Sequence, residues 1–144
     1  MAEAYLEAAE RGVLAQGVNL AFRADPRTWE KDMSYFIEMR KKIEASQKNK
    51  NLTAVTIKYF ADGVIEGGTA AMLEPYSDDP CSHGMPVWQW PELSRAVAAF
   101  DKAGFQTHIH AIDIAELCAL VQYVAPMKLL ASDLGDTRVD QSLQ

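Results

Sequence analysis

The chain has 144 residues, of which 49% are hydrophobic and 24% are charged, a composition typical of one globular domain with an apolar core. Its formal net charge of −6 argues against nucleic-acid binding, because phosphate recognition needs a concentrated basic surface. No run approaches the ~20 consecutive apolar residues of a membrane span, and the N-terminus lacks the pattern of a signal peptide. We therefore expect a cytoplasmic protein that binds neither nucleic acid nor membranes.

The first third of the chain predicts a helix, a short strand and a second helix. Residues 3–11 are helix formers with apolar residues at helical spacing, and residues 18–22 alternate as in a strand. The Asp-Pro pair at 25–26 should open the second helix, with a capping side chain followed by a proline in the first turn. Apolar residues over 29–43 recur at intervals of three and four, which predicts an amphipathic helix. The basic run at 40–42 is interpreted as a solvated helix end.

The remainder continues the alternation of strands and helices. Residues 52–60 are rich in β-formers and predict a buried strand, whereas 61–87 form a long segment rich in Gly, Pro and Asp. A third helix is expected over 91–104, a strand over 105–111, and a fourth helix from the capping Asp113 to Pro126. Strands that alternate with helices indicate an α/β fold with a parallel sheet.

Candidate reactive side chains lie where two of these strands end. Reactive groups of parallel α/β folds gather at the carboxyl ends of the strands, where Lys58, Asp62 and His110 stand. Alternation gives Lys58 and Asp62 one face and gives His108 and His110 another, and only the fold decides whether the two faces converge. Lys58 could equally extend to solvent or pair with Asp62 or Glu66. The histidines could be hydrogen-bonded groups near the core.

Three ordered motifs resemble the amidohydrolase superfamily. They are Ile-Lys-Tyr-Phe-Ala-Asp-Gly at 57–63, Gly-Thr-Ala-Ala-Met-Leu-Glu-Pro-Tyr at 68–76, and Ala-Gly-Phe-Gln-Thr-His-Ile-His-Ala-Ile-Asp at 103–113. The branch that they resemble most includes the N-substituted formamide deformylases. The likeness covers most of the chain up to about residue 124, so we expect an internal part of such a barrel over 1–126. Residues 127–144 are expected to form a divergent tail.

The resemblance implies a partial (β/α) barrel and a metal-dependent hydrolase. Such enzymes hold one or two divalent metals, zinc or a similar ion, and hydrolyse an amide or related carbon-nitrogen bond with water that the metal activates. By position, Lys58 matches the lysine that is carboxylated to bridge two metals, and His110 matches a metal-binding histidine. The resemblance therefore implies Lys58 and His110 as metal ligands, Lys58 and Asp62 as catalytic residues, His108 as a supporting group, and an amide-like small molecule as substrate.

The sequence also departs from the family pattern. A first-strand His-x-His pair, a further histidine and a late aspartate have no counterpart, and the only histidines are His83, His108 and His110. The usual His-Ala-Ile-Gly-Asp pattern lacks its glycine between Ile112 and Asp113. Two hypotheses follow: a hydrolase whose metal is weakly bound or absent and whose activity is impaired in this truncated chain, or a non-catalytic module that associates with itself or binds a small molecule. We expect a homo-oligomer in either case.

Overall fold

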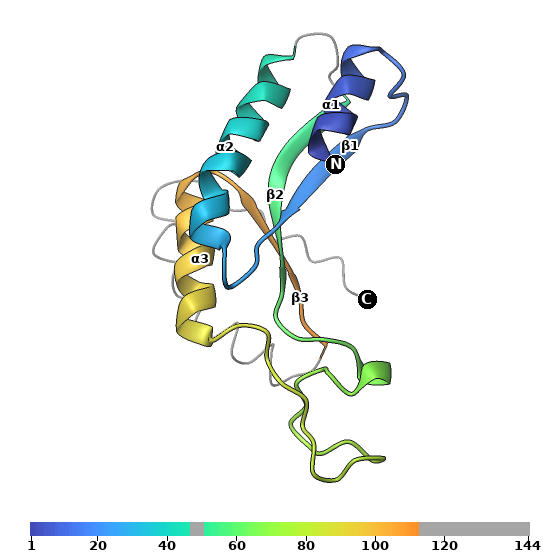
Figure 1. The fold of residues 1–144 in the computed structure, drawn as a ribbon, viewed down its shortest axis with the longest axis vertical. Helices are drawn as coiled ribbons and strands as arrows, with labels where there is room; N and C mark the ends of the chain where they lie inside the picture. Colours follow the sequence, from blue (N-terminus) through green and yellow to red (C-terminus); the bar gives the residue numbers. More distant parts are fainter. Residues whose placement is uncertain (47–50, 113–144) are drawn as a thin grey trace.

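The structure is a computed structural model that describes residues 1–46 and 51–112 (Figure 1). In chain order the elements are α1 (Ala2–Glu10), β1 (Val18–Arg23), α2 (Trp29–Ala45), β2 (Leu52–Phe60), the short 3-10 helix η1 (Ile65–Gly67), α3 (Trp90–Lys102) and β3 (Gln106–His110). The α/β alternation expected from the sequence is confirmed over this range. The helix expected over 113–126 and the tail over 127–144 lie outside the described residues. Within the described ranges, no helix is both long and apolar enough to cross a membrane.

The three strands form one parallel sheet in the order β1-β2-β3. Lys58 of β2 lies beside His108 of β3, and Phe60 lies beside His110. Helices α2 and α3 lie together on one side of the sheet, and residues 61–87 extend beyond the carboxyl ends of β2 and β3 (Figure 1). This topology brings the ends of β2 and β3 to the same edge of the sheet as the long loop.

Helix α2 begins later than the sequence suggested. The Asp25 carboxylate accepts hydrogen bonds from the Arg27 backbone N–H at 2.9 Å and from the Arg27 side chain at 3.0 Å. The Asp25 carbonyl accepts from the backbone N–H groups of Thr28 and Trp29 at 3.0 and 2.9 Å. The Asp-Pro pair therefore forms a turn that leads into α2, and the helix itself begins at Trp29.

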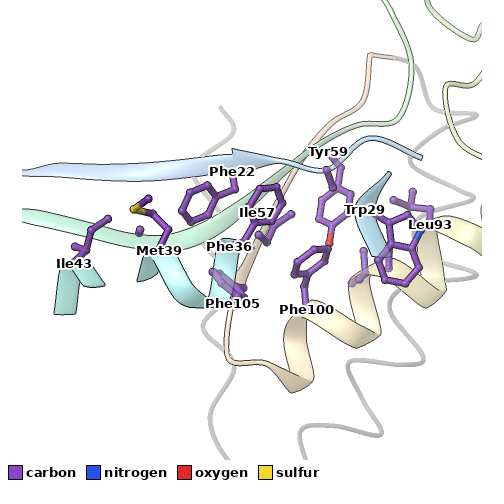
Figure 2. Packing of buried hydrophobic residues seen from close by; sticks show 14 of the residues in the cluster. Phe22, Trp29, Phe36, Met39, Ile43, Ile57, Tyr59, Leu93, Phe100 and Phe105 are labelled. Carbon is purple, nitrogen blue, oxygen red and sulfur yellow. The ribbon is translucent and has the colours of Figure 1, made fainter. Parts of the chain in front are cut away.

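An aromatic core fills the space between the sheet and helices α2 and α3 (Figure 2). Phe22 of β1 stacks on Phe36 of α2 with ring centroids 4.7 Å apart. Phe100 of α3 is 0% exposed and lies about 6 Å from the rings of Trp29, Phe36 and Phe105. Full burial of one such side chain contributes roughly 1.5–3 kcal/mol, so this cluster is the main source of stability.

Arg40 differs from the solvated helix end that the sequence suggested. Its side chain is only 15% exposed, and it donates hydrogen bonds to the carbonyls of Ala103 at 2.8 Å and Gly104 at 3.1 Å. The guanidinium also lies 4.2 Å from the centroid of the Phe105 ring. Gly104 ends α3 with a φ of +80°, which favours glycine. Arg40 thus connects α2 to the turn that starts β3.

The long loop is an ordered element. Its two ends are joined by a 2.7 Å hydrogen bond from the Val87 N–H to the Ala61 carbonyl. Inside it, the buried Tyr76 donates its hydroxyl to the Ala70 carbonyl at 2.9 Å. Gly84 has a φ of +65°, and a Cβ there would lie 2.0 Å from the Ala70 oxygen, so the close approach of the two arms requires glycine. A loop built in this way can hold side chains in fixed positions next to the strand ends.

Candidate functional site

The face of the sheet opposite α2 and α3 gathers the basic side chains of all three strands. In the register, Arg23 of β1, Lys58 of β2 and His108 of β3 stand in one row, and Phe60 and His110 form the next. Neighbouring residues of β2 point to opposite faces of the sheet. Ile57 and Tyr59 point into the core, whereas Lys58 and Phe60 point away from it and are partly accessible to solvent. The face that carries Lys58 on β2 and the face that carries His108 and His110 on β3 are therefore the same face of the sheet. We call it the open face, defined by the five residues of these two rows.

Lys58 lies at the centre of the open face. Its ammonium lies 4.9 Å from the centroid of the Phe60 ring. Among the described residues it forms no salt bridge, so the pairing with Asp62 or Glu66 is not observed. Partial burial lowers the pKa of Lys58 below that of an ordinary lysine, which increases the share of neutral amine. The neutral amine is the nucleophilic form that can react with carbon dioxide to give a carbamate.

His110 is held by the backbone of the long loop. Its Nε2 lies 2.9 Å from the carbonyl oxygen of Gly63. A carbonyl oxygen can only accept a hydrogen bond, so Nε2 bears the proton in this contact, and Nδ1 bears the lone pair in the neutral ring. Metal-binding histidines are usually oriented in this manner, with one ring nitrogen donating to a backbone carbonyl. The side chain is 26% exposed and can therefore be reached by a ligand.

Asp62 lies behind His110 and is fully buried. One carboxylate oxygen, Oδ2, accepts hydrogen bonds from the N–H groups of Ala71 at 3.2 Å and Ile112 at 3.4 Å. The other oxygen, Oδ1, lies 3.8 Å from His110 Nε2 and has no hydrogen-bond partner among the described residues. Asp62 thus connects the long loop to the segment after β3, and it lies near the His110 imidazole without a hydrogen bond to it. A catalytic role for Asp62 stays a prediction.

His108 and His83 have different surroundings. Partial desolvation, together with the positive charges of Lys58 and His110, lowers the pKa of His108, so neutral pH favours its uncharged form. His83 lies on the long loop, where its backbone carbonyl accepts a 2.8 Å hydrogen bond from the Met72 N–H. It belongs to the loop framework.

One cationic neighbour of Lys58, Arg23, was not among the residues that the sequence indicated. The Arg23 guanidinium lies 5.3 Å from the centroid of the Phe60 ring, and His110 lies 5.5 Å from the same ring. Phe60 is thus surrounded by the cationic groups of β1 and β2 and by the imidazole of β3. The alternation in 18–22 could have shown which face Arg23 occupies, but only the register reveals that it lies beside Lys58.

Lys58 and His110 fit two positions of a metal site. A carbamate formed on Lys58 would supply anionic oxygens, and His110 Nδ1 would supply a neutral nitrogen, both suited to zinc-like ions. In the part of the chain that the structure describes, no group of three or more His, Cys, Asp or Glu side chains could hold a metal ion. A catalytic zinc usually takes about three protein ligands, so Lys58 and His110 account for part of such a site.

A parallel α/β sheet that presents a lysine and a histidine at adjacent strand ends fits a segment of a metal-dependent hydrolase barrel. Comparison with known families agrees, since the model of the amidohydrolase family matches residues 2–140. The chain belongs to the amidohydrolase family. The match extends past residue 126, and the expected domain boundary there stays a prediction because it lies outside the described residues.

Three curated relatives match shorter stretches. The chain is 39% identical over 56 residues to the putative amidohydrolase YtcJ of Bacillus subtilis (strain 168), which covers 39% of the chain and 11% of the relative. The chain is also 39% identical over 56 residues to LONG AFTER FAR-RED 3 of Arabidopsis thaliana, which covers 39% of the chain and 10% of that protein. The exoenzymes regulatory protein AepA of Pectobacterium carotovorum subsp. carotovorum is 36% identical over 80 residues, covering 55% of the chain and 17% of that protein. The chain thus spans a small part of each.

Two solved structures have a similar fold. An uncharacterized metal-dependent hydrolase from Pyrococcus furiosus superposes with a TM-score of 0.69 at 21% identity, covering 88% of the chain and 25% of that protein. One from Pyrococcus horikoshii OT3 gives a TM-score of 0.65 at 26% identity, covering 86% of the chain and 24% of that protein. The fold is therefore a fragment of an amidohydrolase-type barrel.

Proposed function

We propose that Lys58 and His110 are ligands of a divalent metal centre, with zinc as the expected ion, that hydrolyses carbon-nitrogen bonds in amide-like small molecules. The main support is the register of β2 and β3, which brings both side chains to the open face, together with the carbonyl of Gly63 that orients His110. Membership of the amidohydrolase family supports the reaction class. Formamides with a substituent on nitrogen are the substrates that the sequence motifs favour.

Each residue has a distinct part in this proposal. A bound metal would lower the pKa of water from 15.7 to roughly 7 and so provide a nucleophile at neutral pH. The lowered pKa of Lys58 increases the share of the neutral amine that carboxylation requires. The buried Asp62 joins the loop to the segment after β3, and the Gly63 carbonyl orients His110. In the net reaction, water oxygen adds to the carbonyl carbon, the carbon-nitrogen bond breaks, and a proton goes to the leaving nitrogen.

The decisive experiment separates His110 from His108. In equilibrium dialysis against zinc, elemental mass spectrometry should find protein-bound metal in the wild-type chain and in His108→Ala, and none in His110→Ala. His108 is a matched control because it is a more exposed histidine on the same face. Metal content that is unchanged in His110→Ala would refute the ligand assignment.

Carboxylation of Lys58 has its own readout. With ¹³C-labelled bicarbonate and zinc, NMR should detect a carbamate carbon in the wild type and none in Lys58→Arg, because the guanidinium stays charged. Zinc-dependent release of amine from N-substituted formamides should disappear in the same variant. A carbamate signal that persists in Lys58→Arg would place the modification elsewhere.

A non-catalytic, self-associating module is the second candidate function, and one observation favours it. Within the described residues, β1 and β3 each pair only with β2, and strands paired on one side invite pairing with another chain. The expected product is a homodimer or a larger closed assembly. Light scattering that shows a stable monomer at micromolar concentration would count against this candidate, whereas a dimer without bound zinc would favour it over the hydrolase.

A further inference from the structure

A cavity of about 500 Å³ opens in the long loop next to the candidate metal site. This volume falls in the range of roughly 300–1,000 Å³ that is usual for small-molecule pockets. Its lining comes entirely from residues of the long loop, namely Gly63, Gly68, Thr69, Ser82, Gly84, Met85, Pro86 and Val87. Glycine, proline and apolar residues predominate, and no charged side chain contributes to the wall.

Close backbone packing shapes this cavity. A Cβ at Gly63 would lie 2.0 Å from the hydroxyl oxygen of Thr69, and a Cβ at Gly84 would lie 2.0 Å from the carbonyl oxygen of Ala70. The Thr69 hydroxyl is itself fixed, because it accepts a 3.0 Å hydrogen bond from the Val64 N–H. Close contacts at Gly63 and Gly84 therefore preform part of the wall, and the side chains of Met85 and Val87 complete it.

The cavity shares a residue with the candidate metal site. Gly63 lines the cavity, and its carbonyl is the group that accepts the hydrogen bond from His110 Nε2 at 2.9 Å. The backbone of Gly63 thus lies between the cavity and the imidazole and contributes to both. The cavity and the candidate metal site are therefore neighbours along one stretch of backbone.

The surface around the cavity is unusually apolar for a part of the chain that faces solvent. Met85 is 76% exposed and Val87 is 43% exposed, and both contribute to the lining. Three further large hydrophobic side chains of the same loop are exposed: Val64, Ile65 and Leu73. Exposed apolar side chains that gather in this way mark interaction sites, ligand-binding grooves among them.

We propose that this cavity binds the apolar substituent of the amide substrate, an aliphatic or aromatic group of several carbons. The amide itself then faces Lys58 and His110. This inference rests on the proposed hydrolase function and adds a substrate class to it: amides with an apolar substituent rather than charged or sugar-like ones. Met85 and Val87 are the residues that set the preference, since they provide the apolar side chains of the wall.

The test measures binding without catalysis. With the full chain kept free of metal by a chelator, the affinities of linear N-alkylformamides from N-butylformamide to N-octylformamide are determined by calorimetry or NMR titration. Each added methylene should strengthen binding about two- to fourfold, the upper value corresponding to ~0.8 kcal/mol per buried CH₂. Met85→Ser and Val87→Thr should flatten this dependence. Leu73→Ser is the matched control, because it removes an exposed leucine of the same loop that does not line the cavity.

Each outcome has a definite meaning. An affinity that does not change with chain length, or a dependence that both wall variants keep, would overturn the proposal. So would a switch from dimer to monomer in Met85→Ser without any amide binding, since a second copy would then cover the cavity. Binding is measured without metal, so a failed zinc or carbamate test with an intact chain-length dependence would refute the hydrolase and leave the cavity assignment standing.

Discussion

The two faces of the sheet differ in what their side chains do. The face covered by α2 and α3 holds the aromatic cluster around Phe100, with residues of β2 at 0% exposure, namely Ile57 and Tyr59. The open face holds Arg23, Lys58 and two histidines, all at least partly accessible to solvent. Because neighbouring residues of one strand point to opposite faces, a single strand contributes to both. Along β2, residues that stabilise the core therefore alternate with residues of the candidate site.

The largest expected effect of a substitution is on the covered face. Phe100→Ala should lower the free energy of unfolding by about 3–5 kcal/mol, because it leaves a cavity among four other aromatic rings. His108→Ala on the open face should change it by no more than about 0.5 kcal/mol. Urea titrations followed by circular dichroism measure both. If both variants lost the same free energy of unfolding, the covered face would not be the main source of stability.

A medium effect is expected at Asp62, which lies where the open face meets the long loop. Asp62→Ala removes the acceptor of the Ala71 and Ile112 N–H groups, which should cost about 1–3 kcal/mol. Hydrogen exchange at these two amides should accelerate in the variant. Asp79→Ala is the control, because Asp79 also accepts a backbone bond in this loop, from the Cys81 N–H, but is exposed. Unchanged exchange at Ala71 and Ile112 would argue against the connecting role of Asp62.

The smallest effect is expected at Asp25, in the turn between β1 and α2, which belongs to neither face. Hydrogen bonds from Arg27 lower the pKa of Asp25 from 3.8 to about 2. A carboxyl group whose pKa is lowered by folding stabilises the folded state at pH values above the pKa of the unfolded state. This stabilisation is lost as the pH falls from about 4 to about 2. Asp25→Asn should therefore be less stable than wild type at pH 7, by about 1 kcal/mol or less, and the difference should shrink at pH 2.5. Urea unfolding at both pH values tests this. A difference that does not depend on pH would rule out the charge as its cause.

The sequence by itself was sufficient for the order of elements and the family. The periodicity of 29–43 and the β-formers of 52–60 fixed α2 and β2, because local side-chain spacing determines which face is buried. The motifs around Lys58 and His110 indicated the amidohydrolase family, which the family match over 2–140 confirms. The start of α2 was placed too early because an Asp-Pro pair serves equally well in a turn that precedes a helix.

Only the tertiary structure decided which residues meet. The register places Lys58 beside His108 and Arg23, and the side-chain alternation within one strand contains no information about the strand next to it. The burial of Arg40 depends on carbonyls at 103–104, more than sixty residues away in the chain. The cavity in the long loop likewise depends on backbone contacts between its two arms, at Gly84 and Ala70. Such contacts depend on how distant segments pack, and this is why the sequence could name candidate ligands but not the pocket beside them.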